Sequence, residues 1–439
     1  MRRRNAIRTI IIAASAIAFV LGYGARAIRL NIFFQSKILL KVQAILWLFG
    51  AVSILMLIFQ FLISNRIYKG PRYFWRHWRI KNRLEKQMID AGFAIQRSYY
   101  VSLPKINLSF QKDFSSAALR IQNTLKFEKR LDDMVLSAAL GKFVVETHYQ
   151  SNDANEYIYE LLDGSVSFKL TFKTYSEFLR YNTTVPPYML FLDKRSQVRL
   201  QHTLIVGQTG SGKSVETYNL ILQMISKPIP YELYISDLKG SGLAVLGDVL
   251  GKKTAVEFDD TVEMIKMFVA KMRERKMAMK ELLKTQLDAD YSDFGLNPHV
   301  LVIDEYATFA EVLSSKKKEL RDSIMALLYE VILQGRQLGN FLFLTMQKSD
   351  SKLIDTALRD NIPLKIVLGN SEQQTYVTAF GYADIPNRDY GPGDGVFTEP
   401  RIAPQPKLVQ CPYCDFDILR ACRESLGGVT TQAPEIKNQ

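Results

Sequence analysis

Cysteine and histidine are scarce in this sequence, with three and four residues respectively among 439. The cysteines show no spacing that predicts disulfide pairs, which excludes the disulfide-rich secreted class and suits a reducing compartment. Cys411, Cys414 and Cys422 supply three of the four ligands that a structural zinc ion needs, and no fourth ligand lies near them in the sequence. We therefore expect ordinary thiols, with a zinc site as the alternative.

Charge is absent from two apolar runs near the start of the sequence, Thr9 to Ala25 and Val42 to Ser64. At 1.5 Å per residue the second run is long enough for a bilayer core, and the first is slightly short at roughly 26 Å. The first run could instead belong to a signal peptide, because arginines precede it and Ala25-Arg26-Ala27 resembles a cleavage site. We favour a hairpin of two transmembrane helices over a signal peptide.

The net charge of +13 is unevenly distributed. Residues 1–90 hold sixteen Lys and Arg against two Asp and Glu, whereas residues 198–410 hold twenty-five against twenty-seven. Basic residues flank the apolar hairpin on both outer sides, which places both flanks in the cytoplasm. Arg26, Arg29 and Lys37 in the connecting loop oppose this orientation but are outnumbered. The basic charge therefore indicates membrane topology and by itself says little about nucleic acid.

A glycine-rich octapeptide follows the apolar run Thr203 to Val206. Its residues are Gly207, Gln208, Thr209, Gly210, Ser211, Gly212, Lys213 and Ser214. Glycines let backbone N–H groups approach phosphates, the lysine supplies a cation for the β and γ oxygens, and the serine hydroxyl reaches Mg²⁺. The segment is thus predicted to be a phosphate-binding P-loop rather than an ordinary glycine-rich turn.

A second motif completes this chemistry at His299 to Glu305, a short apolar strand that ends in two carboxylates. Asp304 would hold Mg²⁺, and Glu305 would act as the general base on the attacking water. Without a P-loop upstream we would read the pair as a solvated strand end. Together the two motifs predict hydrolysis of a nucleoside triphosphate. No Leu-Ser-Gly-Gly-Gln segment exists, which disfavours an ABC transporter.

The chain divides by pattern into an anchor, accessory parts and a motor. Apolar runs alternate with helical stretches after Val198, which predicts an α/β motor core of the RecA type with parallel strands. A small α+β domain with a helix-like stretch at Lys129 to Leu140 precedes it, and no internal repeat is visible. The expected segments are 1–64 (membrane hairpin), 65–100 (basic juxtamembrane linker), 101–197 (α+β accessory domain), 198–410 (motor) and 411–439 (short tail).

Further segments give the chain a family resemblance. They are Ile235 to Gly240, Met272 to Arg275, Gly335 to Gln347, Leu358 to Pro363 and Gly391 to Gly395. In this order they resemble signatures of the FtsK/SpoIIIE-type DNA-pumping ATPases, over roughly residues 200–398. The branch is divergent, because the family's Gln-Arg-Pro is Gln347-Lys348-Ser349 here and its Asp-Pro-Lys is Asp237-Leu238-Lys239.

The resemblance implies ATP and Mg²⁺ as cofactors and a homo-hexameric ring. Gln347 would report the state of the γ-phosphate. Arg336 would act as an arginine finger on a neighbouring subunit, with Arg359 as its competitor and a surface salt bridge as the alternative role for Arg336. Lys239 and the run Lys316 to Lys318 are candidates for facing DNA, although such a run also suits a solvated face.

A short chain with two spans, one α+β segment and one motor resembles the FtsK-like coupling proteins of Gram-positive conjugative plasmids and integrative elements. This resemblance implies a DNA translocase of the cell membrane, multi-pass through its two spans, with both termini and the motor in the cytoplasm. DNA, a relaxase and conjugation-pore proteins would be its partners. The strandedness of the DNA and the direction of movement stay open.

Three alternatives remain. A chromosome-partitioning translocase is disfavoured because we expect no winged helix in the short tail. A protein-secretion ATPase of type VII usually has several motors, whereas one P-loop is present. A scaffold with a relic nucleotide site is disfavoured by the intact Lys213, Ser214, Asp304 and Glu305.

Overall fold

The computed structural model describes residues 3–31, 37–96, 101–124, 127, 130–131, 136–251, 253–347, 354–381, 385–386 and 388–426. It divides into two compact units, Met1–Val166 and Ser167–Gln439. Each unit has its own buried core.

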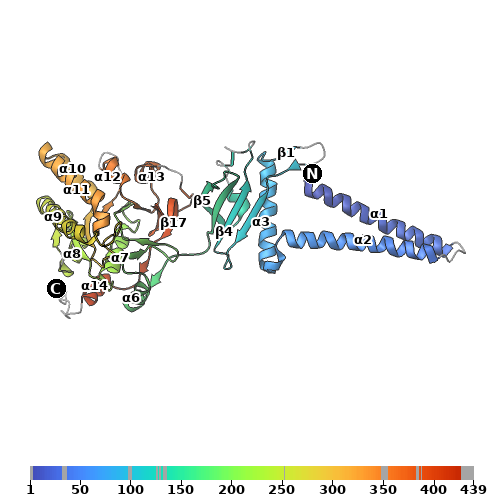
Figure 1. Ribbon diagram of the computed structural model, residues 1–439, viewed down its shortest axis with the longest axis horizontal. Helices are drawn as coiled ribbons and strands as arrows, with labels where there is room; N and C mark the ends of the chain where they lie inside the picture. The colour runs from blue at the N-terminus through green and yellow to red at the C-terminus, as the bar shows by residue number, and fades with distance from the viewer. Residues whose placement is uncertain are drawn as a thin grey trace, which may run out of the picture. The chain divides into compact units, whose positions relative to one another are not determined.

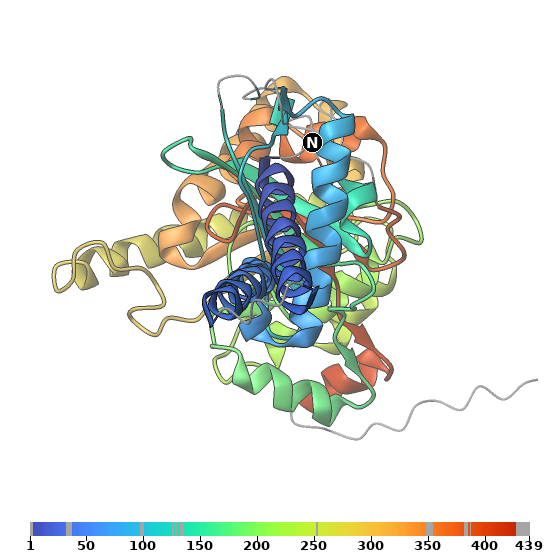
Figure 2. The same cartoon turned by 90° about the vertical axis from the view of Figure 1, so that its right-hand side faces the viewer.

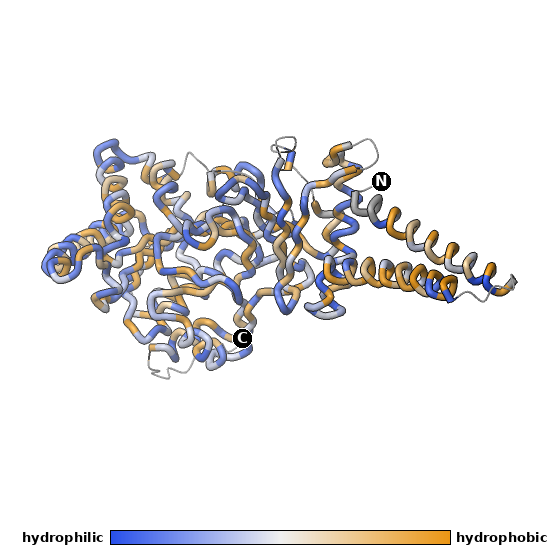
Figure 3. Tube along the Cα trace, turned by 45° about the vertical axis from the view of Figure 1, so that its right-hand side comes forward, coloured by the Kyte–Doolittle hydropathy of each residue, from blue (hydrophilic) through white to orange (hydrophobic). Residues whose placement is uncertain are grey.

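The first unit opens with two long helices, α1 (Arg3–Asn31) and α2 (Lys37–Ser64). They lie side by side in both views of the ribbon (Figures 1 and 2). Apolar residues dominate both helices (Figure 3), and large apolar side chains such as Val20 and Met56 are exposed. By length and composition both helices can cross a membrane. The charge-free runs of the sequence are confirmed as the centres of these two helices.

The rest of the first unit is a helix packed on an antiparallel sheet. Its helical segments are η1 (Ile67–Lys69), α3 (Pro71–Asp90) and α5 (Ser137–Leu140). The four-stranded sheet has the order β3-β4-β6-β5, and a two-stranded ribbon, β1-β2, accompanies it. The strands are β1 (Ile95–Gln96), β2 (Val101–Ser102), β3 (Ile106–Phe110), β4 (Ser116–Gln122), β5 (Phe143–Gln150) and β6 (Glu156–Asp163).

Helix α3 belongs to the core of this unit, within the segment that we expected to be a linker. Its residues Ile80, Leu84 and Met88 are buried in one cluster with Leu108 and Leu119 of the sheet. Local composition shows only that this stretch is strongly basic. The buried face of α3 is visible only in the helical spacing of its apolar residues. Of the helix expected over residues 129–140, residues 130–131 and α5 are helical, and residues 129 and 132–135 lie outside the described residues.

The second unit is built around an eight-stranded sheet with the order β12-β11-β13-β14-β10-β15-β16-β17. Strands β12 through β15 in that order are parallel, and β16 and β17 are antiparallel additions. The strands are β10 (Thr203–Gly207), β11 (Glu232–Asp237), β12 (Lys253–Ala255), β13 (His299–Asp304), β14 (Asn340–Met346), β15 (Leu364–Leu368), β16 (Asp394–Glu399) and β17 (Ala403–Gln410). Central strands β10, β13 and β14 are buried almost throughout, as expected for a parallel sheet covered on both faces.

Helices connect these strands and cover them. They are α6 (Tyr175–Thr184), α7 (Lys213–Ile225), α8 (Gly242–Val249), α9 (Phe258–Leu282), α10 (Tyr306–Ser314), α11 (Lys318–Leu338), α12 (Thr356–Asp360), α13 (Gln373–Phe380) and α14 (Ile418–Ser425). Helix α9 packs along α11, while α14 packs against α7 and α8. The α/β class expected for the motor is confirmed.

The second unit begins at Ser167, before the boundary expected at residue 198, and it includes the tail. Phe178 of α6 and Phe191 of β8 are buried in the same core as Cys411 and Cys422. Three short strands, β7 (Thr171–Phe172), β8 (Met189–Phe191) and β9 (Gln197–Arg199), precede the large sheet, and β7 pairs with β18 (Tyr413–Cys414). Strands about 240 residues apart leave no local sign of their pairing. The sequence pattern therefore places β7 in the accessory domain and β18 in the tail, although both belong to the second unit.

Candidate nucleotide-hydrolysis site

Four neighbouring strands carry the predicted motifs at one edge of the sheet. Strands β11, β13, β14 and β10 are adjacent and parallel, so their carboxyl ends meet at that edge. Asp237 ends β11, Asp304 ends β13, Gln347 follows β14 and the P-loop follows β10. Ligands of open α/β sheets bind at this edge. The sheet topology therefore brings together motifs that are up to 140 residues apart.

The P-loop has the backbone that its glycines permit. Gly210 and Gly212 have φ of +84° and +94°, a region that side chains rarely adopt. A Cβ atom at Gly212 would lie 2.6 Å from the backbone nitrogen of Gly393, whose N–H donates to the Ser211 carbonyl at 2.8 Å. A Cβ at Gly210 would meet nothing within 4 Å. The loop is thus packed on one side and open on the other.

Two observations test whether a phosphate group suits this loop. The hydroxyl of Ser211 is buried and has no hydrogen-bond partner among the described residues. A buried polar group without a partner costs free energy, which a bound ligand can recover. The side chain of Lys213 is also directed at the carboxylates of the site instead of solvent. The residues present therefore fit an anionic ligand.

Lys213 is the cation of a buried network. Its Nζ donates to Thr345 Oγ1 at 3.1 Å and to Glu305 Oε2 at 3.4 Å, and it lies 3.7 Å from Asp304 Oδ1. The hydroxyl of Thr345 donates to Asp304, and it accepts from the Glu305 N–H at 3.2 Å. Two adjacent carboxylates thereby share one lysine in a place where an unpaired charge would be costly.

Glu305 is held in an uncommon conformation. Its φ and ψ of 47° and 59° are left-handed, although it is neither glycine nor asparagine. Its side chain is buried, accepts the Gln347 N–H at Oε1 (3.0 Å), and pairs at Oε2 with Lys239 (3.2 Å). Backbone strain of this kind persists only where surrounding contacts hold it, and it concentrates at active sites.

Lys239 reaches Glu305 from the turn after β11. Asp237 organises this turn by accepting the backbone N–H of Lys239, Ser241 and Ala244 and the Ser241 hydroxyl. The Lys239 side chain remains 44% exposed while its amine contacts the buried carboxylate. It therefore links the surface to the general-base candidate.

Burial changes the charge balance behind the P-loop. Burial raises the pKa of Glu216 to about 8, so this carboxyl group in the first turns of α7 is neutral at pH 7.

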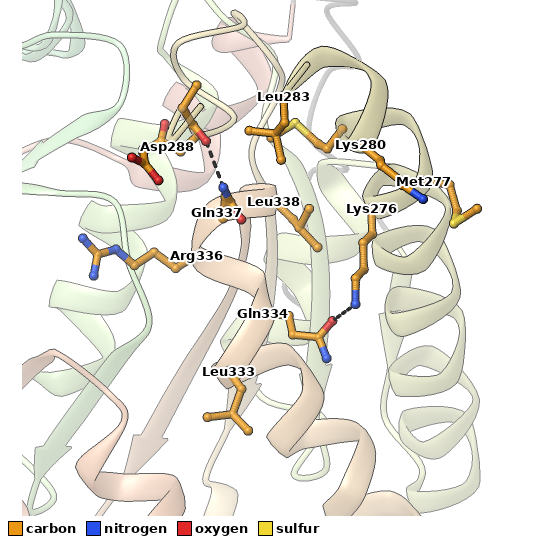
Figure 4. Close-up of a pocket in the computed structure, with 13 residues that line it drawn as sticks. Lys276, Met277, Lys280, Leu283, Asp288, Leu333, Gln334, Arg336, Gln337 and Leu338 are labelled. Carbon is orange, nitrogen blue, oxygen red and sulfur yellow. Dashed lines mark hydrogen bonds between the residues drawn. The ribbon is translucent and has the colours of Figure 1, made fainter. Parts of the chain in front are cut away.

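The structure brings most predicted residues together and places Arg336 elsewhere. Lys213, Asp304, Glu305 and the backbone of Gln347 form one site. Arg336 lies in the last turn of α11, just before β14 begins, and therefore at the amino edge of the sheet, opposite the P-loop. There it lines a cavity of about 780 Å³ between α9 and α11, and its side chain extends away from Lys276 and Gln334 (Figure 4).

The other candidate cations have different surroundings. Arg359 is held inside its own subunit by the Thr378 carbonyl at 2.9 Å and by Asp360 at 2.7 Å. Lys316 lies over the Phe258 ring at 4.8 Å, and Lys316, Lys317 and Lys318 are exposed. Cys411, Cys414 and Cys422 are free and buried, and no group of three metal-binding side chains occurs among the described residues.

Sequence reasoning missed Thr345 and the ion pair of Lys239. Thr345 lies within the family segment Gly335 to Gln347, for which the sequence predicts a role only for Arg336 and Gln347. A polar residue inside the run Phe341 to Met346, two positions before Gln347, was the available signal. Lys239 was interpreted only as a DNA-facing residue, because its distance to Glu305 depends on the neighbouring order of β11 and β13.

Comparison with known proteins identifies this region. Residues 183–353 match the FtsK/SpoIIIE family. The chain carries an FtsK/SpoIIIE domain. This domain is a P-loop ATPase of that family, which confirms the resemblance, the fold class and the ATPase activity inferred from the sequence.

Relatives of this domain occur in several systems. The chain is 30% identical over 183 residues to the Ftsk domain-containing protein YdcQ of Bacillus subtilis, covering 42% of this chain and 37% of YdcQ. It is 26% identical to the type VII secretion system protein EssC of Staphylococcus aureus, covering 42% of this chain and 13% of EssC. The chain thus spans about a third or less of the length of these relatives.

A solved structure resembles the chain over a longer range. The pCW3 conjugation coupling protein TcpA, determined as a monomer with ATPγS, is 16% identical with a TM-score of 0.51. The match covers 79% of this chain and 98% of TcpA. At this identity the likeness shows a shared fold.

The buried His202 near the amino edge of the sheet predicts a pH effect on stability. Its Nδ1 accepts the Leu342 N–H at 3.0 Å, and burial, with a contribution from nearby Arg336, lowers its pKa to about 3. The folded chain keeps this ring neutral at pH 5, whereas the unfolded chain protonates it near pH 6.5. Lowering the pH from 7 to 5 should therefore reduce the free energy of unfolding by about 2 kcal/mol.

This effect is measured by urea unfolding of the detergent-solubilised chain at both pH values. In His202→Gln, which retains an amide but does not titrate, the loss between pH 7 and 5 should be smaller by about 2 kcal/mol. If both proteins lose the same free energy of unfolding between pH 7 and 5, His202 does not cause the pH dependence.

Proposed function

We propose that this protein is a membrane-anchored, ATP-driven DNA translocase that acts as a conjugative coupling protein. The observation that carries the proposal is the position of Lys239. This lysine is nearly half exposed, as a contact to a DNA phosphate requires, and it also lies 3.2 Å from the buried general-base candidate Glu305. The same side chain can therefore connect DNA binding with hydrolysis.

The residues of the site have defined roles in this proposal. The P-loop amides and Lys213 bind the β and γ phosphates. Ser214 and Asp304 would hold Mg²⁺, and the metal would neutralise phosphate charge. Glu305 accepts a proton from the water that attacks the γ-phosphorus, while Gln347 and Thr345 position the water and the carboxylates.

The anchor and the ring belong to the same proposal. The two apolar helices cross the cell membrane with their basic flanks inside, so that the motor works in the cytoplasm. A homo-hexamer would allow Arg336 to act on the nucleotide of a neighbouring subunit, a role compatible with its distance from its own P-loop. Arg359 is the weaker candidate because its guanidinium is already bonded within the subunit. Relaxase and conjugation-pore proteins are the proposed partners.

ATP turnover of the purified full chain tests the proposal. We expect duplex or single-stranded DNA to stimulate turnover, and the stronger of the two identifies the cargo. Donor cells lacking the protein should also fail to transfer plasmid DNA and still segregate their chromosomes normally. A chromosome-partitioning role predicts the reverse result in cells.

A protein-secretion ATPase is the second candidate, favoured by the 26% identity to EssC. It predicts that DNA leaves turnover unchanged and that an exported protein stimulates it. Indifference to both kinds of DNA would overturn the DNA-pump proposal.

Replacing Lys239 with alanine should uncouple DNA from hydrolysis. Because a hydrogen bond to a charged group contributes about 1.5–3 kcal/mol, turnover at saturating DNA should fall by about 10- to 150-fold. ATP affinity should change by less than about twofold, since Lys213 supplies the phosphate cation. The matched control is Lys173→Ala, an exposed lysine of the same unit. Full DNA stimulation of the Lys239 variant would contradict the coupling role.

A further inference from the structure

Helix α3 has two opposite faces that differ in chemistry. Tyr73, His77, Ile80, Leu84 and Met88 are buried and face the sheet of the first unit. The exposed positions are Pro71, Arg72, Trp75, Arg79, Arg83, Lys86 and Asp90. Spacings of three or four residues place Arg72, Trp75, Arg79, Arg83 and Lys86 on one stripe along the helix, opposite the buried positions, and Asp90 continues it at the last residue of the helix. We call the five residues from Arg72 to Lys86 the basic stripe.

The basic stripe begins at the end of the second apolar helix. Phe61 in the last turn of α2 contacts Phe74 of α3 edge to face, with ring centroids 5.6 Å apart. Arg66 between the helices reaches the hydroxyl of Tyr73 at 3.4 Å. These contacts join the first turn of α3 directly to the end of the segment that can span a membrane. The start of the stripe therefore lies at the depth where such a segment leaves the bilayer.

Tryptophan at this point is informative. Trp75 is 56% exposed, and its ring meets Trp78 edge to face at 5.7 Å. An exposed indole is costly in water, but it is favoured among lipid headgroups, where its apolar body and polar N–H are both accommodated. The stripe thus combines an interfacial aromatic residue with four cations.

The cations of the stripe are available to an external anion. Arg79, Arg83 and Lys86 form no ion pair with an acidic side chain in the described part of the chain. Arg72 lies over the ring of Phe114 at 5.3 Å, which fixes its position without neutralising its charge. Glu85 and Asp90 are the only acidic residues of α3, against six Lys and Arg.

We propose that the basic stripe binds the headgroups of anionic phospholipids in the leaflet where α2 ends. The proposal rests on the proposed function only in requiring that α1 and α2 cross a membrane. DNA has a complementary charge as well, but the junction with α2 and the exposed Trp75 favour lipid. Binding there would hold the first unit against the membrane surface and limit its rotation about the end of α2.

Quenching of Trp75 by brominated lipid tests this proposal in the full chain. A variant with Trp47→Phe and Trp78→Phe leaves Trp75 as the only tryptophan, since the chain has three. This protein is reconstituted into vesicles of brominated phosphatidylcholine alone, or of phosphatidylcholine and phosphatidylglycerol at about 3:1, both brominated. We expect quenching to be at least twofold stronger in the anionic vesicles and to weaken in 0.5 M salt.

Charge reversal identifies the residues responsible. Arg79→Glu, Arg83→Glu and Lys86→Glu together should abolish the difference between the two vesicles. The matched control, Lys173→Glu, Lys194→Glu and Lys253→Glu, reverses three exposed cations of the second unit and should preserve it. Retained ATP turnover and a normal circular dichroism spectrum show that the reversed chain is folded.

Two results would overturn the proposal. One is equal quenching of Trp75 in neutral and anionic vesicles. The other is charge reversal that leaves quenching unchanged and instead lowers affinity for a duplex DNA probe, which would make the stripe a DNA contact. Because the quenching measurement uses neither DNA nor ATP, its failure is distinct from a failure of the DNA-pump proposal.

Discussion

Replacing Glu305 with glutamine is expected to lower ATP turnover by about 100- to 1,000-fold while ATP still binds. Glutamine keeps the size of the side chain and can still accept the Gln347 N–H, but it cannot take the proton of the attacking water. The P-loop and Lys213 are unchanged, so a fluorescent ATP analogue should bind with an affinity within about threefold of the parent protein. Phosphate release measures the turnover.

The control for this variant is Glu311→Gln, which changes an exposed carboxylate in α10, the helix that Glu305 precedes. It should retain full turnover. In cells, Glu305→Gln should abolish transfer of DNA to a recipient. Near-normal turnover by Glu305→Gln would remove Glu305 from the role of general base, and normal DNA transfer by it would overturn the proposed function.

Replacing Gly212 with alanine is expected to destabilise the protein and to abolish nucleotide binding. Alanine would have to adopt a φ of +94°, which costs about 1–2 kcal/mol for an L-residue. Its Cβ would also lie 2.6 Å from the Gly393 nitrogen and 3.0 Å from the Gly393 Cα, atoms of the backbone that cannot rotate away. The total cost is about 2–5 kcal/mol, which corresponds to a fall in Tm of about 5–15 °C. If the loop moves to relieve the contact, the phosphate cradle is lost instead.

Gly210→Ala separates the cost of backbone strain from the cost of the contact with Gly393. Gly210 also has a positive φ, but a Cβ atom there would lie in open space. In the absence of nucleotide Gly210→Ala should lower Tm by about 2–6 °C through backbone strain alone. Thermal unfolding and ATP binding are measured on both variants. Equal Tm values for the two variants would show that the contact with Gly393 contributes nothing.

Much of the site was predictable because its chemistry resides in short motifs. The glycines, Lys213 and Ser214 must be consecutive for one loop to surround a phosphate, so their order is visible in any sequence. The carboxylates at Asp304 and Glu305 follow an apolar strand for a similar reason. The apolar runs after Thr203 and after His299 likewise predicted β10 and β13 closely, since strands buried on both faces are continuously apolar.

The contacts that complete the site were not predictable. Thr345 lies in β14, whereas Lys239 and Glu305 follow β11 and β13, and only the order β11-β13-β14 sets their distances. The proximity of Gly393 to Gly212 depends on β16, which Gly393 directly precedes and which pairs antiparallel with β15. In each case the partners are separated by dozens of residues and share no periodicity that a linear pattern could reveal.

The sequence alone therefore predicted a P-loop ATPase motor, a candidate hydrolytic carboxylate and two membrane-length apolar helices. These features depend on consecutive residues and on local hydrophobicity. Tertiary structure decided the boundaries of the two units, the separation of Arg336 from its own P-loop, the link from Lys239 to Glu305 and the outward face of α3. These features depend on which segments pack into the same core, and packing between segments far apart in the chain determines that.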